Sequence, residues 1–342
     1  MNVYADHAAT TPMRACAKEA MLEALEDFGN PSSIHSAGRL AAVRLESARK
    51  EVAELLNCRP SEIYFTSGGT EADNWAIRAA RYGDGHVVAS AFEHHAIIHA
   101  LEAMAREKER HVELVKPERD GIVDPERVRR NVSQYTNLVT VMAANNEVGT
   151  IQPVEEIGRE IRKGGNKRTI FHTDAVQAVG HIPVDVQKMG VDMLSLSAHK
   201  FGGPKGVGVL YCRNGIILDP LLFGGGQERG NRPGTENTPG IVAMAVAMRE
   251  ACENMESEAA KTRELRDRRD PAFRAARDPD CCRQKRAHEH GGDRAGPERE
   301  VRRSHEGQKE PAPDLHSGDS TNGLPPERPG RHVRIPGAGP RR

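Results

Sequence analysis

Residues 62–71 are Glu62-Ile63-Tyr64-Phe65-Thr66-Ser67-Gly68-Gly69-Thr70-Glu71, and this stretch decides the fold. Its first five residues form a short run rich in β-branched and aromatic side chains, which predicts a buried strand over 62–66. The two glycines that follow permit a sharp turn, and helical spacing then continues to residue 81. A strand that passes directly into a helix is the building unit of an α/β sheet.

The same alternation continues through the first 270 residues. Apolar spacing predicts further helices over 15–28, 37–56, 96–108, 125–131 and 154–162. Short apolar runs predict further strands at 86–89, 112–115, 138–142, 169–172, 193–196 and 206–211. We therefore predict an α/β fold with a mostly parallel central sheet and helices on both faces, without an internal repeat of fixed period.

The last 72 residues, 271–342, have a different composition. Six of them are large aliphatic or aromatic residues, whereas ten are proline, nine are glycine and thirteen are arginine. So little apolar surface cannot offset the entropy of ordering the chain, so this segment is predicted to be a disordered tail. The whole chain balances 49 Lys and Arg against 49 Asp and Glu, which disfavours a dedicated nucleic-acid or membrane-surface binder.

Targeting and metal-binding signals are weak. The first residues lack the charged and apolar regions of a signal peptide, and no run reaches the roughly 20 apolar residues of a membrane span, so a cytoplasmic protein is expected. The six cysteines have no disulfide or zinc spacing. His95 and His99 have the i,i+4 spacing of helical zinc ligands, but no third ligand accompanies them, so no metal is predicted and surface or core histidines are the simpler interpretation.

In a parallel α/β sheet the ligand site lies at the carboxyl ends of the strands, so the polar residues there are considered together. Gly69 and Thr70 open a helix, where free N–H groups favour a phosphate, although such a turn can also be a simple cap. Asp174 ends a largely apolar strand, where a carboxylate needs a cation. Lys200 also follows an apolar run, which suits a nucleophilic amine, although a lone lysine after a strand is usually a solvated surface residue.

A histidine near a strand end, such as His94, can stack on a flat ligand. Together, an anion cradle, an imidazole, a buried carboxylate and a lysine correspond to the phosphate, ring face, ring nitrogen and aldehyde of pyridoxal phosphate. Asp174 would keep the ring nitrogen protonated, so that the ring accepts electrons. A second glycine turn at 202–206 lacks the frame of a phosphate loop, and a turn into the next strand is its simpler interpretation.

Six motifs in the same order resemble the cysteine desulfurases of the NifS/IscS type, which are PLP-dependent enzymes of fold type I in the class-V aminotransferase family. They occupy residues 4–12, 29–33, 66–74, 145–149, 172–177 and 197–200, the last being Ser197-Ala198-His199-Lys200. The resemblance continues through residues 230–237. It implies a homodimer that takes sulfur from L-cysteine, releases L-alanine, and passes the sulfur as an enzyme persulfide to an iron–sulfur scaffold protein or another acceptor.

The resemblance also assigns roles to individual residues. Lys200 would carry pyridoxal 5'-phosphate covalently and move a proton at the substrate α-carbon, and His94 would stack on the ring. Asp174 would pair with the ring nitrogen and Gln177 with the phenolic oxygen. The other implied contacts are the phosphate ligands Gly69, Thr70, Ser197 and His199, the phosphate contact of Thr235 to the other subunit, and Asn146 beside the cofactor and the substrate carboxylate.

The resemblance divides the chain into an N-terminal active-site segment at 1–15, a large PLP-binding domain at 16–255, the start of a small domain at 256–270, and the non-family tail at 271–342. The family's Ser- and Gly-rich loop with its nucleophilic cysteine has no counterpart here, and neither Cys281 nor Cys282 lies in such a context. Our hypothesis is a shift of reading frame near residue 269. A one-nucleotide shift of the coding DNA should then restore a Ser-Gly-x-Ala-Cys-like loop.

The missing loop leaves two other functions open beside that of the desulfurase. One is an inactive chain that still binds the cofactor through its large domain. The other is a related lyase that acts on selenocysteine or cysteine sulfinate and needs no protein persulfide.

Overall fold

The structure is a computed structural model that describes residues 3–79, 85–108, 111–163 and 168–269. Every described residue lies in one compact unit, within residues 1–278. The predicted disordered tail and the segment assigned to a shifted reading frame lie outside the described residues.

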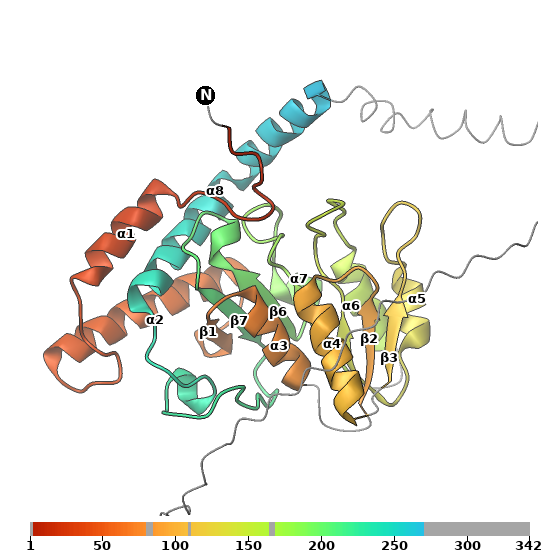
Figure 1. The fold of residues 1–342 in the computed structure, drawn as a ribbon, viewed down its shortest axis with the longest axis horizontal. Coiled ribbons are helices and arrows are strands. Elements are labelled where there is room, and N and C mark those ends of the chain that lie inside the picture. The colour runs from red at the N-terminus through yellow and green to blue at the C-terminus, as the bar shows by residue number, and fades with distance from the viewer. Residues whose placement is uncertain (1–2, 80–84, 109–110, 164–167, 270–342) are drawn as a thin grey trace, which may run out of the picture. The chain divides into compact units, whose positions relative to one another are not determined.

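Within the described residues, seven strands form one sheet in the order β1-β7-β6-β5-β4-β2-β3 (Figure 1). Strands β2 to β6 run parallel, whereas β7 pairs antiparallel with both β1 and β6. The mostly parallel α/β sheet predicted from the sequence is therefore confirmed. The strands are β1 (Ile63–Thr66), β2 (His86–Ser90), β3 (Val112–Val115), β4 (Thr136–Thr140), β5 (Ile170–Asp174), β6 (Met193–Ser197) and β7 (Gly208–Cys212).

Helices cover both faces of this sheet. The larger core joins one face to α2, α6, α7 and α8, whereas α3 and α4 pack on the opposite face. The α-helices are α1 (Ala15–Leu25), α2 (Ser36–Leu56), α3 (Gly69–Ala79), α4 (His95–Lys108), α5 (Pro125–Asn131), α6 (Val154–Lys163), α7 (Val186–Met189) and α8 (Thr238–Arg269). Three short 3-10 turns accompany them, η1 (Pro60–Glu62), η2 (Ala198–Lys200) and η3 (Glu228–Gly230).

The period of two along each strand separates apolar from polar side chains. On β6, Leu194 and Leu196 belong to the larger core, whereas Met193 packs in the cluster on the α3 side. Ser195 and Ser197 share the Met193 side of the strand and are buried. The α3 side of the sheet centre therefore carries polar groups toward the carboxyl ends of the strands.

Several predicted boundaries differ from the structure, among them the end of the first helix, at Leu25 instead of 28, and the start of β7, at Gly208 instead of 206. Strand β4 spans 136–140 instead of 138–142, because Thr136 and Thr140 pair with β2 while Val141 and Met142 already lie beyond the strand. The predicted boundary between 16–255 and 256–270 falls inside α8, whose first half is buried against α1 and α2. The domain boundary itself stays a prediction.

A buried ion pair fixes the loop between β7 and α8. Arg49 of α2 donates two hydrogen bonds to the Glu228 carboxylate, at 2.6 and 2.9 Å, and a third to the carbonyl of Ile63 at 2.9 Å. The two side chains are 4% and 1% exposed. Glu228 also accepts the backbone N–H of Phe65 at 2.9 Å, so the loop is tied to both α2 and β1.

The same loop contains left-handed backbone at two residues other than glycine. Glu228 has φ 46° and Arg229 has φ 60°, a conformation that such residues rarely adopt without support from their surroundings. The Arg229 guanidinium lies 4.0 Å from the centre of the Tyr64 ring and donates to the Ile63 carbonyl at 2.7 Å. Together with the Arg49–Glu228 pair, these contacts offset the conformational strain of the turn.

Among the described residues, no helix is both long and apolar enough to cross a membrane.

Candidate functional site

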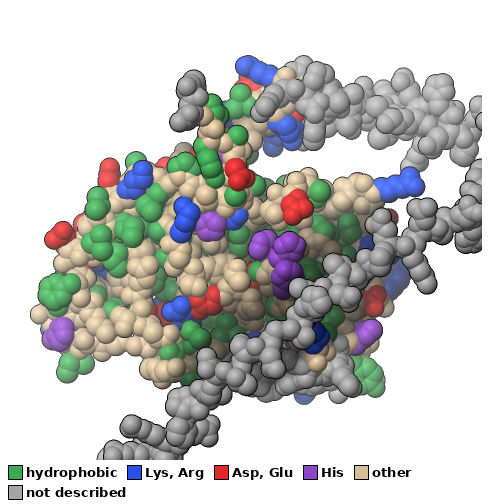
Figure 2. All heavy atoms as spheres, viewed as in Figure 1, with side chains coloured by type: hydrophobic (Ala, Val, Ile, Leu, Met, Phe, Trp, Pro, Cys, Tyr) green, Lys and Arg blue, Asp and Glu red, His purple; other side chains and the backbone are tan. Residues whose placement is uncertain are grey.

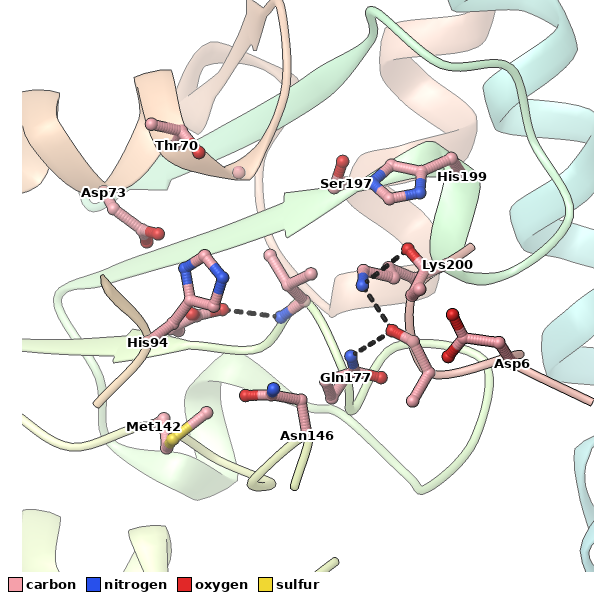
Figure 3. Close-up of a pocket in the computed structure, with 15 residues that line it drawn as sticks. Asp6, Thr70, Asp73, His94, Met142, Asn146, Gln177, Ser197, His199 and Lys200 are labelled. Carbon is pink, nitrogen blue, oxygen red and sulfur yellow. Dashed lines mark hydrogen bonds between the residues drawn. The ribbon is translucent and has the colours of Figure 1, made fainter. Parts of the chain in front are cut away.

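A pocket of about 470 Å³ opens at the carboxyl edge of the sheet (Figure 3). Every residue predicted to bind the cofactor lines it except Thr235: Gly69, Thr70, His94, Asn146, Asp174, Gln177, Ser197, His199 and Lys200. They come from α3, from the last residues of β5 and β6, and from the segments that follow β2, β4, β5 and β6, so sheet topology brings together residues far apart in the sequence. Thr235 is exposed on the loop after η3, and its predicted contact with another subunit stays a prediction.

One end of the pocket suits an anion. Gly69 and Thr70 are the first residues of α3, where backbone N–H groups lack partners within the helix and the helix dipole favours negative charge. A Cβ on Gly69 would lie 2.6 Å from Cγ2 of Val176, so a larger residue there would displace the Val176 side chain. Ser197 and His199 face this end from the end of β6 and from η2 (Figure 3). The donor set fits a phosphate group.

The other end of the pocket holds Asp174 at the end of β5. This residue is 4% exposed, and one of its carboxylate oxygens accepts the Val176 N–H at 2.8 Å. Burial raises the pKa of Asp174 to about 6, although the Val176 N–H and the positive charge of Lys200 oppose the shift. A buried carboxylate with so little compensation favours a cationic ligand atom, such as a protonated ring nitrogen.

His94 lies between β2 and α4 at the side of the pocket. Its Nδ1 accepts the Ala96 N–H at 3.1 Å, so the other ring nitrogen carries the proton of the neutral form. Burial, together with the charges of Lys200 and His95, lowers the pKa of His94. The residue therefore presents a neutral, flat ring, which suits stacking on an aromatic ligand.

Lys200 is held by the N-terminal segment. Its Nζ donates to the carbonyl oxygens of Ala8 and Ala9, the latter at 3.0 Å. Gln177 donates to the same Ala8 carbonyl at 2.9 Å (Figure 3). Burial lowers the pKa of Lys200, whereas Asp174 and Asp6 oppose the shift. A depressed amine pKa increases the neutral fraction that can attack a carbonyl carbon.

The pocket also includes residues to which the sequence analysis gave no individual role: Asp6, Ala8, Ala9, Asp73, Met142 and Val176. The first three lie in the segment at 1–15 that the resemblance assigned to the active site. Helical spacing could have identified Asp73, because it lies one turn after Gly69 and Thr70 and so shares their side of α3. The two alanines contribute backbone carbonyls, a role that their side chains do not signal.

A second pocket of about 520 Å³ adjoins the first, because His94 and Asn146 line both. It lies between residues 91–95 and 145–148. Asn145 stabilises this loop, since its Oδ1 accepts the N–H groups of Glu147 and Val148 at 2.8 and 2.9 Å. The two adjacent amides therefore differ in role, and Asn146 is the one that faces the main pocket (Figure 3).

Histidines gather on this face of the molecule (Figure 2). The rings of His95 and His99 stack 5.0 Å apart, and that of His94 lies 6.2 Å from His95. In the part of the chain that the structure describes, no three His, Cys, Asp or Glu residues are grouped to hold a metal ion.

The four described cysteines lie away from this chemistry. Cys16, Cys58, Cys212 and Cys252 line neither pocket. Burial raises the pKa of Cys16 to about 11 and of Cys58 and Cys212 to about 12, and it also raises that of Cys252. Thiols with raised pKa values are poor nucleophiles at neutral pH, so the described residues offer no activated thiolate at the pocket.

The buried carboxyl group of Glu93 should make the stability of the fold depend on pH. Glu93 is buried, its carboxylate accepts the Ser90 hydroxyl and the Met142 N–H, and burial raises its pKa to about 8. Between the ordinary glutamate pKa and about 8, the folded protein keeps a proton that the unfolded chain releases, so stability falls as pH rises. Between about pH 6 and about pH 9, the unmodified protein should lose on the order of a few kcal/mol of unfolding free energy through this group. We expect Glu93→Gln to lack this loss.

Urea unfolding at both pH values measures the effect. Glu118→Gln, which removes an exposed carboxylate, is the matched control and should follow the unmodified protein. Parallel stability curves for the unmodified chain and Glu93→Gln would contradict the prediction.

Comparisons with known proteins agree with one another. Residues 3–288 match the family Aminotransferase class-V. Cysteine desulfurase IscS of Methanosarcina thermophila is 47% identical over 274 residues, covering 78% of this chain and 66% of the relative. IscS of Clostridium botulinum strain Hall is 45% identical over 271 residues, covering 78% and 67%. The chain thus spans about two thirds of the length of these curated relatives.

Solved structures give the same result. A NifS-like protein has a TM-score of 0.76 at 42% identity and covers 78% of this chain and 74% of its own. A structure of SspA in complex with cysteine has a TM-score of 0.68 at 37% identity, covering 72% of each chain.

Proposed function

The chain belongs to the class-V aminotransferase family, and on that premise we propose that it is a pyridoxal 5'-phosphate-dependent cysteine desulfurase. One observation carries the proposal. A single pocket combines a lysine amine, a buried carboxylate and a helix N-terminus that begins with a closely packed glycine. The similarity to two IscS cysteine desulfurases and to SspA, whose structure was solved in complex with cysteine, supports the reaction and its substrate.

The residues present fit the cofactor. Gly69, Thr70, Ser197 and His199 would hold its phosphate, Asp174 its ring nitrogen, and Gln177 its phenolic oxygen. His94 would stack on the ring, and Lys200 would attach it through the amine. When bound, the cofactor supplies an electron-accepting ring and an electrophilic carbon.

The remaining steps use groups of the protein. Asn146 would orient the carboxylate of L-cysteine, because its amide faces the same pocket. Lys200, once released from the cofactor, would take the proton from the substrate α-carbon and return it later. The C–S bond breaks, its electron pair stays with carbon and takes a proton to give L-alanine, and the sulfur forms a persulfide with an acceptor thiol.

The described residues do not supply the thiol that would accept the sulfur. Their cysteines lie outside the pocket with raised pKa values. This observation favours a second candidate, a chain that binds the cofactor without turnover. A lyase acting on selenocysteine or cysteine sulfinate would also need no protein thiol, and it is the third candidate.

We also propose that the chain acts as a homodimer in the cytoplasm and delivers sulfur to an iron–sulfur scaffold protein or another acceptor. Thr235 is exposed on the loop that the Arg49–Glu228 pair holds. The same loop exposes Leu222 and Phe223, at 56% and 88%, an unusual exposure for large apolar side chains in a subunit that functions alone. Thr235 would reach the phosphate bound by the other subunit.

Two measurements on the purified full chain test the function. A visible absorption band after addition of the cofactor reports its attachment to a lysine, and alanine and sulfide released from L-cysteine with a thiol reductant report turnover. The band together with alanine supports the desulfurase. A band without alanine supports the cofactor-binding candidate, and the absence of a band would sink both.

A further inference from the structure

One acid in the pocket has no part in the proposed reaction. Asp73 is 1% exposed, lies on α3 one turn after Gly69 and Thr70, and lines the same pocket as Asp174. Figure 3 shows its carboxyl group pointing from α3 toward the ring of His94. Its Oδ1 has no hydrogen-bond partner among the described residues. Asp73 is thus a buried polar side chain with free bonding capacity inside the cofactor pocket.

A row of polar contacts connects Asp73 to the strand that carries Asp174. His172 Nε2 on β5 lies 3.7 Å from Asp73 Oδ1. Ser195 Oγ lies 3.0 Å from His172 Nε2, and His172 Nδ1 lies 2.9 Å from Thr140 Oγ1. His172 precedes Asp174 by two residues on β5, so both side chains lie on the face that α3 covers.

The charges around Asp73 do not favour its ionised form. Burial lowers the pKa of His172 to about 3, so this ring stays neutral. Asp174 on β5 and Glu93 before α4 are acids, and Ser195 on β6 is uncharged. Lys200 acts on Asp174 across the pocket, and the neutral ring of His94 lies at its side. Burial, followed by the Asp174 charge, raises the pKa of Asp73 well above its ordinary value.

We propose that Asp73 and Asp174 form a carboxyl pair that keeps one proton, with Asp73 as the neutral partner and Asp174 as the anion presented to the cofactor ring. Two neighbouring carboxyls in a water-poor site cannot both ionise without a cation. The proton on Asp73 keeps the negative charge on Asp174, where the ring nitrogen would bind. Asp73 is then a positioning residue, and this role rests on the proposed function because it assumes a ring cation.

The first test needs no cofactor. Carbon-13 NMR of the full chain labelled at aspartate carboxyls should show one carboxyl that stays protonated at neutral pH and disappears in Asp73→Asn. In Asp174→Asn the same signal should titrate at lower pH, because the neighbouring charge is gone. A signal of Asp73 that titrates near the ordinary aspartate pKa of about 3.9 overturns the proposal.

The second test measures cofactor affinity. The amide of Asp73→Asn reproduces a neutral donor and acceptor, so its Kd should stay within about threefold of the unmodified protein, whereas Asp174→Asn should weaken binding by about tenfold or more. Asp73→Leu is similar in size but apolar, and it should weaken cofactor binding. Asp73→Asn keeps the polar group, so its affinity should stay near that of the unmodified protein. Equal weakening by Asp73→Asn and Asp174→Asn would show that Asp73 is ionised and would overturn the pair.

The two tests separate the inference from the function on which it rests. If the unmodified chain fails to bind pyridoxal 5'-phosphate, the proposed function fails, whereas the NMR titration still decides the protonation of Asp73. Circular dichroism checks the fold of each variant. The comparison of Asp73→Asn with Asp174→Asn carries the conclusion even where Asp73→Leu does not fold.

Discussion

Replacing Lys200 with alanine is expected to abolish the visible absorption of the lysine-bound cofactor and to lower alanine release from L-cysteine by at least about a thousandfold. Lys200 is the lysine of the described pocket lining, and its amine is partly desolvated with a lowered pKa. An alanine side chain at position 200 can neither attach the cofactor nor carry a proton. Spectra recorded during cofactor titration, with an assay for alanine, measure both effects.

Lys205→Ala is the matched control. Lys205 lies in the glycine turn five residues later, is exposed, and does not line the pocket, so both the band and the rate should stay unchanged. Retention of the band in Lys200→Ala, or its loss in Lys205→Ala, would assign the attachment to another amine. If the unmodified chain binds the cofactor but shows no turnover, the absorption band alone carries this test.

Replacing Arg49 with alanine is expected to destabilise the fold by about 3 to 5 kcal/mol, because it leaves the carboxylate of Glu228 buried without its partner. The pair is almost fully excluded from water, and Arg49 also satisfies the carbonyl of Ile63. The left-handed turn at Glu228 and Arg229 would lose its main support. Chemical denaturation followed by circular dichroism measures the change in the free energy of unfolding.

Arg249→Ala is the control for removal of an arginine from an ion pair. Arg249 contacts Glu51, but its side chain is 52% exposed, so the loss should stay within about 1 kcal/mol. A loss that small in Arg49→Ala would contradict the role given to the buried pair. The double variant Arg49→Met with Glu228→Gln should recover part of the lost stability, because it removes both charges at once.

Local pattern predicted most of the sheet. The strands at 112–115 and 193–196 and the helices at 37–56 and 154–162 agree with the structure to within one residue at each end, because their apolar spacing coincides with the buried face. The predicted range for β4 was shifted by two residues from the observed strand, for a physical reason. Val141 and Met142 are apolar and buried like strand residues, although the ladder with β2 ends at Thr140.

The candidate site was predictable where a side chain carries distinctive chemistry at a strand end. Lys200, Asp174 and the glycine turn at Gly69 were found in this way, and the structure brings them to one pocket. The resemblance assigned the segment at 1–15 to the active site, but the individual contributions of Asp6 and of the Ala8 and Ala9 carbonyls were not predicted. Thr11 holds this segment at the pocket, because it bonds to the carbonyl of His199 at 3.0 Å through its N–H and 2.9 Å through its hydroxyl, a pairing that sequence distance conceals.

The sequence by itself determined the α/β class, the family resemblance and the residue types of a cofactor site, because periodicity and strand-end chemistry are local properties of the chain. Only the tertiary structure decided which acids share one desolvated space. Asp73 and Asp174 are 101 residues apart in the chain, yet burial in one pocket couples their charges. That coupling depends on water exclusion and distance, which arise only once α3 has packed on the sheet.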